Sequence, residues 1–175
     1  GLYIDATGIV QAKSVLSSVR GDHMDATSAT GTTITSTGEA FNGVYVTDGT
    51  YTLNKPIITM TGNGRSDFVG YGAAIVGTGS TTRLFLDSAK LTNKGAVRTG
   101  VVADAGANVI VKNSTIVTQD GVLPFDYQPT VNTPFMESAP WMLSLTGNNR
   151  ATNLLGENTK ASYLSSSISS ENWGV

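Results

Sequence analysis

Two stretches of this chain share one pattern of residue types, and the repeat limits the folds that the chain can adopt. Residues 108–121, NVIVKNSTIVTQDG, align with residues 83–95, RLFLDSAKLTNKG. The aliphatic positions match in pairs that are 25 residues apart: Phe85 with Ile110, Leu86 with Val111, and Leu91 with Ile116. A poorer copy, YLSSSISSENWG, places Ile168 52 residues after Ile116, which we interpret as two periods and a small insertion. Repetition with a period of about 20–50 residues is typical of solenoids and related arrays.

The residue pattern predicts that the repeated unit is built from strands. Short runs of Val, Ile, Leu and Thr are broken by Gly and Asn, and apolar residues rarely recur at helical spacing. A coil of about 25 residues holds three short strands with their turns, and stacked coils form parallel sheets whose strands lie about 4.8 Å apart. We therefore expect an all-β solenoid, a parallel β-helix of about seven coils or fewer, with aliphatic side chains inside.

Residues 9–20, IVQAKSVLSSVR, are an exception to this pattern. Val15, Leu16 and Val19 would share one face of a helix. We predict a short helix here, which would cap the N-terminal end of the solenoid and protect its edge.

The period also predicts which side chains are neighbours. Asp87 and Lys112 should lie on adjacent coils and point outward, as a surface ion pair worth at most about 1 kcal/mol. Ser88 and Asn113 should stack at a turn.

The net charge and the amino-acid composition exclude several classes of protein. The net charge is −2 and the isoelectric point about 5.2, so the chain lacks the basic character of proteins that bind nucleic acid. No apolar run is long enough to span a membrane as a helix. Cysteine is absent, which excludes disulfides and thiol chemistry. The first residue is not Met, and we expect either a processed chain or a part of a longer one.

Two phrases resemble known β-helix proteins. Residues 44–64, VYVTDGTYTLNKPIITMTGNG, look like the opening coil of right-handed parallel β-helices of the pectate-lyase-like superfamily. Residues 109–121, VIVKNSTIVTQDG, resemble the repeat phrase of secreted bacterial β-helix proteins, adhesins included. The resemblance covers about residues 41–122 and 160–175, and it implies a right-handed coil and an extracellular or bacterial cell-surface location. The superfamily includes polysaccharide lyases, hydrolases, tailspikes and adhesins, so the fold alone does not select a function.

The expected organisation is a single β-helix domain over residues 1–175, within a longer chain or an assembly. Residues 1–40 would form an N-terminal cap region and residues 41–121 regular coils. An inserted loop would occupy residues 122–143, and residues 144–175 would form further coils.

The enzymes of this superfamily use clustered acidic residues, so an enzyme of this kind should show paired carboxylates in its sequence. Two carboxylates about 5–10 Å apart are the minimum for glycoside hydrolysis. The sequence has no Asp-Asp or Asp-x-Asp, and Asp48-Gly49 and Asp120-Gly121 are typical of turns. The single histidine, His23, lies between Asp22 and Asp25, but one His with exposed acids is a weak metal signal. We assign no catalytic residue, metal ligand or cofactor from the sequence.

One stretch interrupts the pattern. Residues 122–143, VLPFDYQPTVNTPFMESAPWML, hold four of the five prolines of the chain, which is incompatible with a central strand. Loops inserted in repeat proteins often carry the binding face, and aromatic rings beside carboxylates suit sugars. The candidate ligand-binding residues are Phe125, Asp126, Tyr127, Phe135, Glu137 and Trp141. The alternative is a loop that folds back and covers the flank of the solenoid with these aromatic rings.

Two functional hypotheses follow. The first is a secreted or cell-surface structural or adhesive module without catalytic activity, which self-associates through the ends of the β-helix or binds a host surface. The second is a carbohydrate-active enzyme or a carbohydrate-binding module that uses the loop at 122–143. Paired carboxylates beside that loop would favour the enzyme, and flat exposed aromatic rings alone would favour binding.

Overall fold

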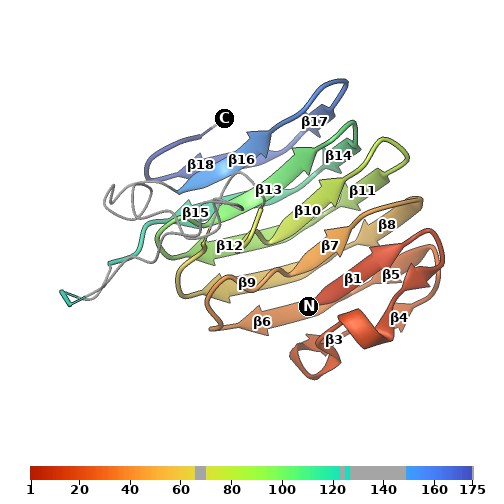
Figure 1. The fold of residues 1–175 in the computed structure, drawn as a ribbon, viewed down its shortest axis with the longest axis horizontal. Helices are drawn as coiled ribbons and strands as arrows, with labels where there is room; N and C mark the ends of the chain where they lie inside the picture. The colour runs from red at the N-terminus through yellow and green to blue at the C-terminus, as the bar shows by residue number, and fades with distance from the viewer. Residues whose placement is uncertain (66–69, 123–124, 127–148, 175) are drawn as a thin grey trace.

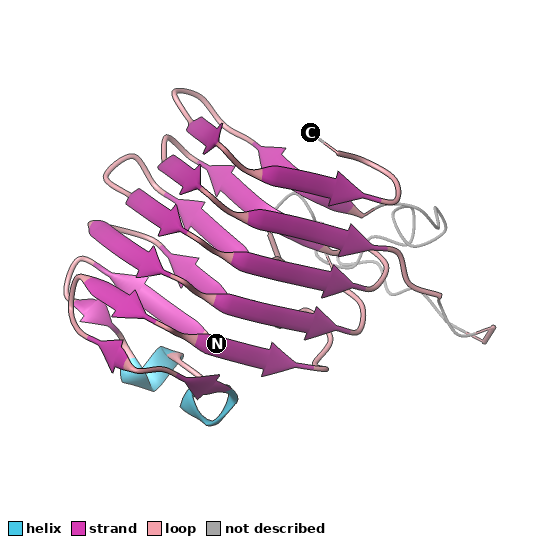
Figure 2. Ribbon diagram, turned by 180° about the vertical axis from the view of Figure 1, so that it is seen from behind, coloured by secondary structure: helices cyan, strands magenta, loops and turns pink. Residues whose placement is uncertain are grey.

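The chain folds into three parallel-stranded sheets that wind around a common core. The structure, a computed structural model, describes residues 1–65, 70–122, 125–126 and 149–174. Each sheet has six strands in these residues, and the chain visits the three sheets in turn before it starts the next layer (Figures 1 and 2). The fold is thus all-β, and its arrangement is compatible with a β-helix-like solenoid.

Each sheet takes one parallel strand from every coil, and five such coils occur in the described residues. Sheet I consists of β1 (Leu2–Asp5), β7 (Val44–Val46), β10 (Ile75–Thr78), β13 (Thr99–Asp104) and β16 (Arg150–Leu154). Sheet II consists of β5 (Ser28–Thr30), β8 (Thr50–Asn54), β11 (Arg83–Asp87), β14 (Asn108–Lys112) and β17 (Lys160–Leu164). Sheet III consists of β6 (Thr33–Ser36), β9 (Ile57–Thr61), β12 (Lys90–Lys94), β15 (Thr115–Gln119) and β18 (Ser167–Ser170).

The core lies between the three sheets because side chains alternate along each strand. In β11, Leu84 and Leu86 point inward and are buried, whereas Phe85 between them is exposed. The same alternation in the other coils builds one continuous hydrophobic core. Its fully buried members include Ile4, Ile34, Leu53, Ile58, Ile75, Leu91, Val101, Val109 and Ile116.

The register predicted from the repeat is confirmed. Phe85 pairs with Ile110, Leu86 with Val111, and Leu91 with Ile116. Ile116 also pairs directly with Ile168 on the next coil. The interpretation of their 52-residue separation as two periods is therefore wrong: it is one coil, lengthened by the insertion between β15 and β16.

Asp87 and Lys112 are register partners, as the period predicts, but the expected ion pair is not among those found in the described residues. Asp87 Oδ1 instead accepts hydrogen bonds from Asn113 Nδ2 (3.1 Å) and Ser88 Oγ (2.9 Å). The hydrogen bond from Asn113, then that from Ser88 and, more weakly, the charge of Lys112 lower the pKa of Asp87. Short polar side chains at the turn thus reach the carboxylate in place of the long lysine.

The corner between sheets II and III repeats in every coil. Ser88 and Asn113 lie there in equivalent places, as predicted, and both have a positive φ, +56° and +53°. Lys55 (φ +54°) and Ser165 (φ +48°) take the same place in two other coils. Each of these corners is one residue in the left-handed region, which turns the chain sharply without a long loop.

The left-handed corner predicts opposite effects on stability when each of two lysines is replaced by glycine. The left-handed conformation costs an L-residue about 1–2 kcal/mol, which glycine avoids, although glycine loses more entropy on folding. We expect Lys55→Gly to stabilise the fold by about 0.5–1 kcal/mol. Lys90→Gly, at an exposed position in the extended strand β12, should destabilise it by a similar amount. Urea unfolding of both variants tests this, and destabilisation by Lys55→Gly would contradict the corner geometry.

The N-terminal end of the solenoid is closed by short antiparallel strands. These are β2 (Gly8–Ile9) on β1, β3 (Val19–Arg20) on β6, and β4 (His23–Met24) on β5. Each sheet edge is thus paired at this end. A cap forms as expected, but strands provide most of it.

The predicted helix over residues 9–20 is wrong. The segment contains two single-turn 3₁₀ helices, η1 (Gln11–Lys13) and η2 (Leu16–Ser18), and extended residues around them. Ser14 Oγ donates to Val10 O (2.8 Å) and accepts from Tyr3 N (3.0 Å), so it ties the segment to β1. Such serine bonds compete with helix continuation, and only Val19 of the expected apolar face is buried.

The C-terminal end is built differently. Each of β16, β17 and β18 has a parallel neighbour on one side only, apart from an isolated bridge between Arg150 and Trp173. The inward-facing side chains of the last coil, Ala161, Tyr163 and Ile168, are only partly buried, whereas their counterparts one coil earlier are fully buried. Among the described residues, no further coil covers this end of the core.

A buried arginine holds together the corner between sheets III and I. Arg98 has no exposed surface, and its guanidinium donates hydrogen bonds only to backbone carbonyls. The acceptors are the carbonyl oxygens of Gly38, Phe41, Thr61, Gly62 and Gly72. Burial lowers the pKa of Arg98 to about 10, with the charge of Glu39 opposing that shift, so the side chain is cationic at neutral pH.

Small residues line the start of sheet I, next to this corner. Gly43, Ala74, Gly100 and Ala151 are in register on successive coils. A Cβ at Gly100 would lie 2.4 Å from Ala151 O and 2.6 Å from the side chain of Ile116. The close approach of sheets I and III thus excludes larger side chains here.

No helix in the described part of the chain has the length and apolarity needed to cross a membrane.

Candidate functional site

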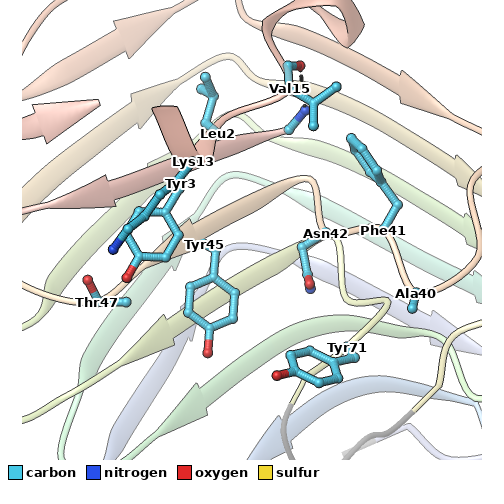
Figure 3. A pocket seen from close by; sticks show the side chains of 11 residues that line it. Leu2, Tyr3, Lys13, Val15, Ala40, Phe41, Asn42, Tyr45, Thr47 and Tyr71 are labelled. Carbon is cyan, nitrogen blue, oxygen red and sulfur yellow. Dashed lines mark hydrogen bonds between the residues drawn. The ribbon is translucent and has the colours of Figure 1, made fainter. Parts of the chain in front are cut away.

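One hollow of the described surface lies on the outer face of sheet I near the capped end. It has a volume of about 520 Å³, within the range of about 300–1,000 Å³ common for small-ligand sites. Figure 3 shows side chains from three places in the sequence around it. They come from β1 and the segment after it, from residues 40–47, and from Tyr71. We call this hollow the tyrosine cleft.

Two tyrosine rings form its central wall. Tyr3 on β1 and Tyr45 on β7 are register partners, so both side chains point outward from adjacent strands. Their rings are nearly parallel, at 6°, with centroids 5.8 Å apart, and Figure 3 shows them displaced sideways as an offset stack. Offset stacking of this kind is a favourable aromatic geometry.

One cation and three phenols approach each other in the cleft. Lys13 Nζ lies 4.5 Å from the centroid of the Tyr3 ring, a cation–π contact. Burial raises the pKa of Tyr45, and the nearby Tyr71, Tyr3 and Asp104 raise it further. The Tyr45 phenol therefore remains a neutral hydroxyl group at physiological pH, able to donate and to accept hydrogen bonds.

The opposite wall is anchored to the solenoid by backbone contacts. Asn42 Nδ2 donates to Gly70 O (2.5 Å) and Ala73 O (3.1 Å), which fixes the chain that leads from Tyr71 into β10. Phe41 O accepts one of the hydrogen bonds of Arg98 (2.7 Å). The cleft is thus held in shape by the same corner that buries Arg98.

The sequence-predicted site lies elsewhere, and most of it falls outside the described residues. Of the six candidates, Phe125 and Asp126 are described, and both are exposed, the Phe125 ring fully so. The others, Tyr127, Phe135, Glu137 and Trp141, lie outside the described residues, so the predicted loop site stays a prediction.

Several acidic side chains in the described coils stabilise turns by accepting hydrogen bonds from backbone N–H groups. Asp48 Oδ1 accepts from Gly49 N (2.7 Å), and Asp120 Oδ1 accepts from Gly121 N (2.9 Å), which confirms both predicted turns. Asp104 accepts from Ala105 N (2.6 Å) in the same way. Asp67 lies outside the described residues.

The histidine region is a turn held by one carboxylate. Asp25 accepts hydrogen bonds from Thr27 N and Ser28 N, and His23 Nε2 lies 2.9 Å from its Oδ2. The Thr27 backbone, then His23 and the Ser28 backbone, hold the pKa of Asp25 well below its usual range. Within the described residues, no three His, Cys, Asp or Glu side chains gather closely enough to hold a metal ion.

The sequence did not indicate the tyrosine cleft, because its residues are not one period apart. Tyr3 and Tyr45 are register partners but lie 42 residues apart, since the N-terminal cap is inserted between them. Tyr71 belongs to an irregular connection before β10. Tyr45 lies in the segment, residues 44–64, that resembles an opening coil, but this resemblance does not indicate a ligand.

Comparison with protein-family models, curated proteins and solved structures finds no match to this chain.

Proposed function

We propose that this chain is a structural or adhesive module of a secreted or cell-surface protein, a right-handed parallel β-helix related to the pectate-lyase-like superfamily. The observation that supports it most is the difference between the two ends. One end has its sheet edges paired, whereas the other has strands with one neighbour and partly exposed inward side chains. A sheet edge of this kind is a template for pairing with further strands.

In this proposal the C-terminal end is the self-association surface. The paired N-terminal end offers no equivalent long parallel strand, so contact occurs through the C-terminal coil. Leu154, Leu164 and Trp173 are exposed there and add apolar area. The charged residues of this end, Arg150, Glu157, Lys160 and Glu171, cancel, so net charge does not oppose contact between copies.

Sedimentation of residues 1–175 at increasing concentration tests the proposal. We expect association of the 18.2 kDa chain, which Ile168→Asp should abolish because it places a charge on the last coil. Ser169→Asp, on the outward side of the same strand, is the matched control and should associate normally. A wild-type chain that stays monomeric at every concentration would overturn the self-association. For the natively isolated protein, mass measurement and electron microscopy should show paired particles, because a single self-association surface closes a dimer.

The second candidate is a carbohydrate-binding or carbohydrate-active module that uses the loop at 122–143. The full exposure of Phe125 beside the exposed Asp126 is the observation that favours it. Phe125→Ala should then weaken binding to a polysaccharide in native affinity gels. Equal retardation of variant and wild type would contradict a role for Phe125.

A further inference from the structure

The tyrosine cleft has the features of a ligand site, although the proposed function does not use it. It is a concave surface with an aromatic wall and a few polar groups, which is the usual composition of small-ligand sites. Its walls are fixed by hydrogen bonds from Asn42 and Arg98, so binding would need little rearrangement.

The chemistry of the cleft restricts its ligand. The offset rings of Tyr3 and Tyr45 give an aromatic platform on which Lys13 lies over the Tyr3 ring, so a ligand ring would stack mainly on Tyr45, and the phenol of Tyr71 offers a further polar group. The lining residues include a lysine and no carboxylate, so a cationic ligand is disfavoured. A pyranose ring has an apolar C–H face and a rim of hydroxyl groups, and it matches this combination.

We infer that the tyrosine cleft binds a neutral or anionic saccharide, whose ring stacks on the platform of Tyr3 and Tyr45 while Lys13 and Tyr71 hydrogen-bond to its hydroxyl or carboxylate oxygens. The described lining of this binding site includes no residue of the stretch 122–143 and none of the last coil. Binding there does not depend on self-association, so the sedimentation experiment and the binding experiment can fail independently.

An extended, proline-rich peptide would fit the cleft less well than a sugar. Grooves for such peptides rely on aromatic rings that grip apolar proline rings. Here a lysine covers one face of the Tyr3 ring, and Asn42, Thr47 and Tyr71 add polar groups among the apolar lining residues. Polar groups around a platform need a ligand with many hydrogen-bonding groups, since desolvating them without partners is unfavourable.

Native affinity electrophoresis of residues 1–175 with laminarin, galactomannan, xylan and alginate tests the inference. We expect retardation by at least one of these polysaccharides and at least a tenfold loss of affinity in Tyr45→Ala. Tyr45→Phe should keep most of the binding, because the platform remains. Phe85→Ala removes an outward aromatic ring from sheet II and should bind as the wild type does.

The ligand class and the place of binding are checked separately. Alginate alone among the four is anionic, so Lys13→Met should weaken alginate binding more than binding to the neutral polysaccharides. Thr47→Trp, at the margin of the cleft, should block binding by filling it and serves as a second variant if Tyr45→Ala unfolds. Retardation by none of the four, or unchanged retardation in the folded cleft variants, would overturn the inference. Wild-type binding to oligoproline in place of the polysaccharides would also overturn it.

Discussion

Replacing Arg98 by Met is expected to destabilise the fold by about 3–5 kcal/mol, the range found when one partner of a buried charged group is removed. The guanidinium satisfies carbonyl oxygens from three separate stretches of chain, represented by Gly38, Gly62 and Gly72. Methionine fills similar volume but donates no hydrogen bond, so these carbonyls are left buried and unpaired. Urea unfolding, followed by circular dichroism, measures the change.

Two further variants separate hydrogen bonding from charge at this position. Arg98→Lys keeps the positive charge but has three donors on one nitrogen in place of the planar fork, so we expect an intermediate loss of about 2 kcal/mol. Arg83→Ala is the control. Arg83 also donates to backbone carbonyls, of Ser80 (3.0 Å) and Thr82 (2.8 Å), but it is exposed, and its loss should cost less than about 1 kcal/mol. Equal effects of Arg98→Met and Arg83→Ala would contradict the assigned role of Arg98.

The second large effect is expected at Gly100. Gly100→Val adds a β-branched side chain where a Cβ alone meets backbone oxygen at 2.4 Å and the Ile116 side chain at 2.6 Å. Backbone cannot yield without separating two coils, so we expect a loss of about 3 kcal/mol or more.

Gly21→Ala provides the comparison for Gly100. A Cβ at Gly21 finds its nearest atoms at 3.5 Å, an ordinary contact, and the change should stay within about 0.5 kcal/mol. Thermal unfolding of both variants measures the two changes in stability. A Gly100→Val protein as stable as the wild type would mean that sheets I and III do not approach closely at this corner.

The coil architecture could be predicted from the sequence because its cause is local. Inward and outward residues alternate, as in Leu84, Phe85 and Leu86, and this alternation predicts strands. The constant spacing between matching positions of two coils predicts their register and their parallel order. Corner residues were partly predictable as well: Ser88 and Asn113 were recognised as equivalent, although their left-handed conformation was not.

Other features depend on contacts between residues far apart in the sequence. The helix predicted at residues 9–20 fails because Ser14 hydrogen-bonds to Tyr3 and Val10, a tertiary effect that helical periodicity does not include. The buried Arg98 could not be predicted, since nothing local in the sequence shows that five carbonyls surround it. The tyrosine cleft was missed for the same reason.

The measurement that tests the central claim most directly is the distance between the last two coils across the insertion. The chain lacks cysteine, so Val117→Cys and Ser169→Cys can carry nitroxide spin labels without other changes. These outward residues are register partners on β15 and β18, and adjacent strands lie about 4.8 Å apart. The account predicts strong dipolar broadening in the doubly labelled protein and none in the pair Val117 and Ser162, which lie on different sheets. A Val117–Ser169 spectrum equal to the sum of the two singly labelled spectra would contradict a solenoid that continues past the insertion.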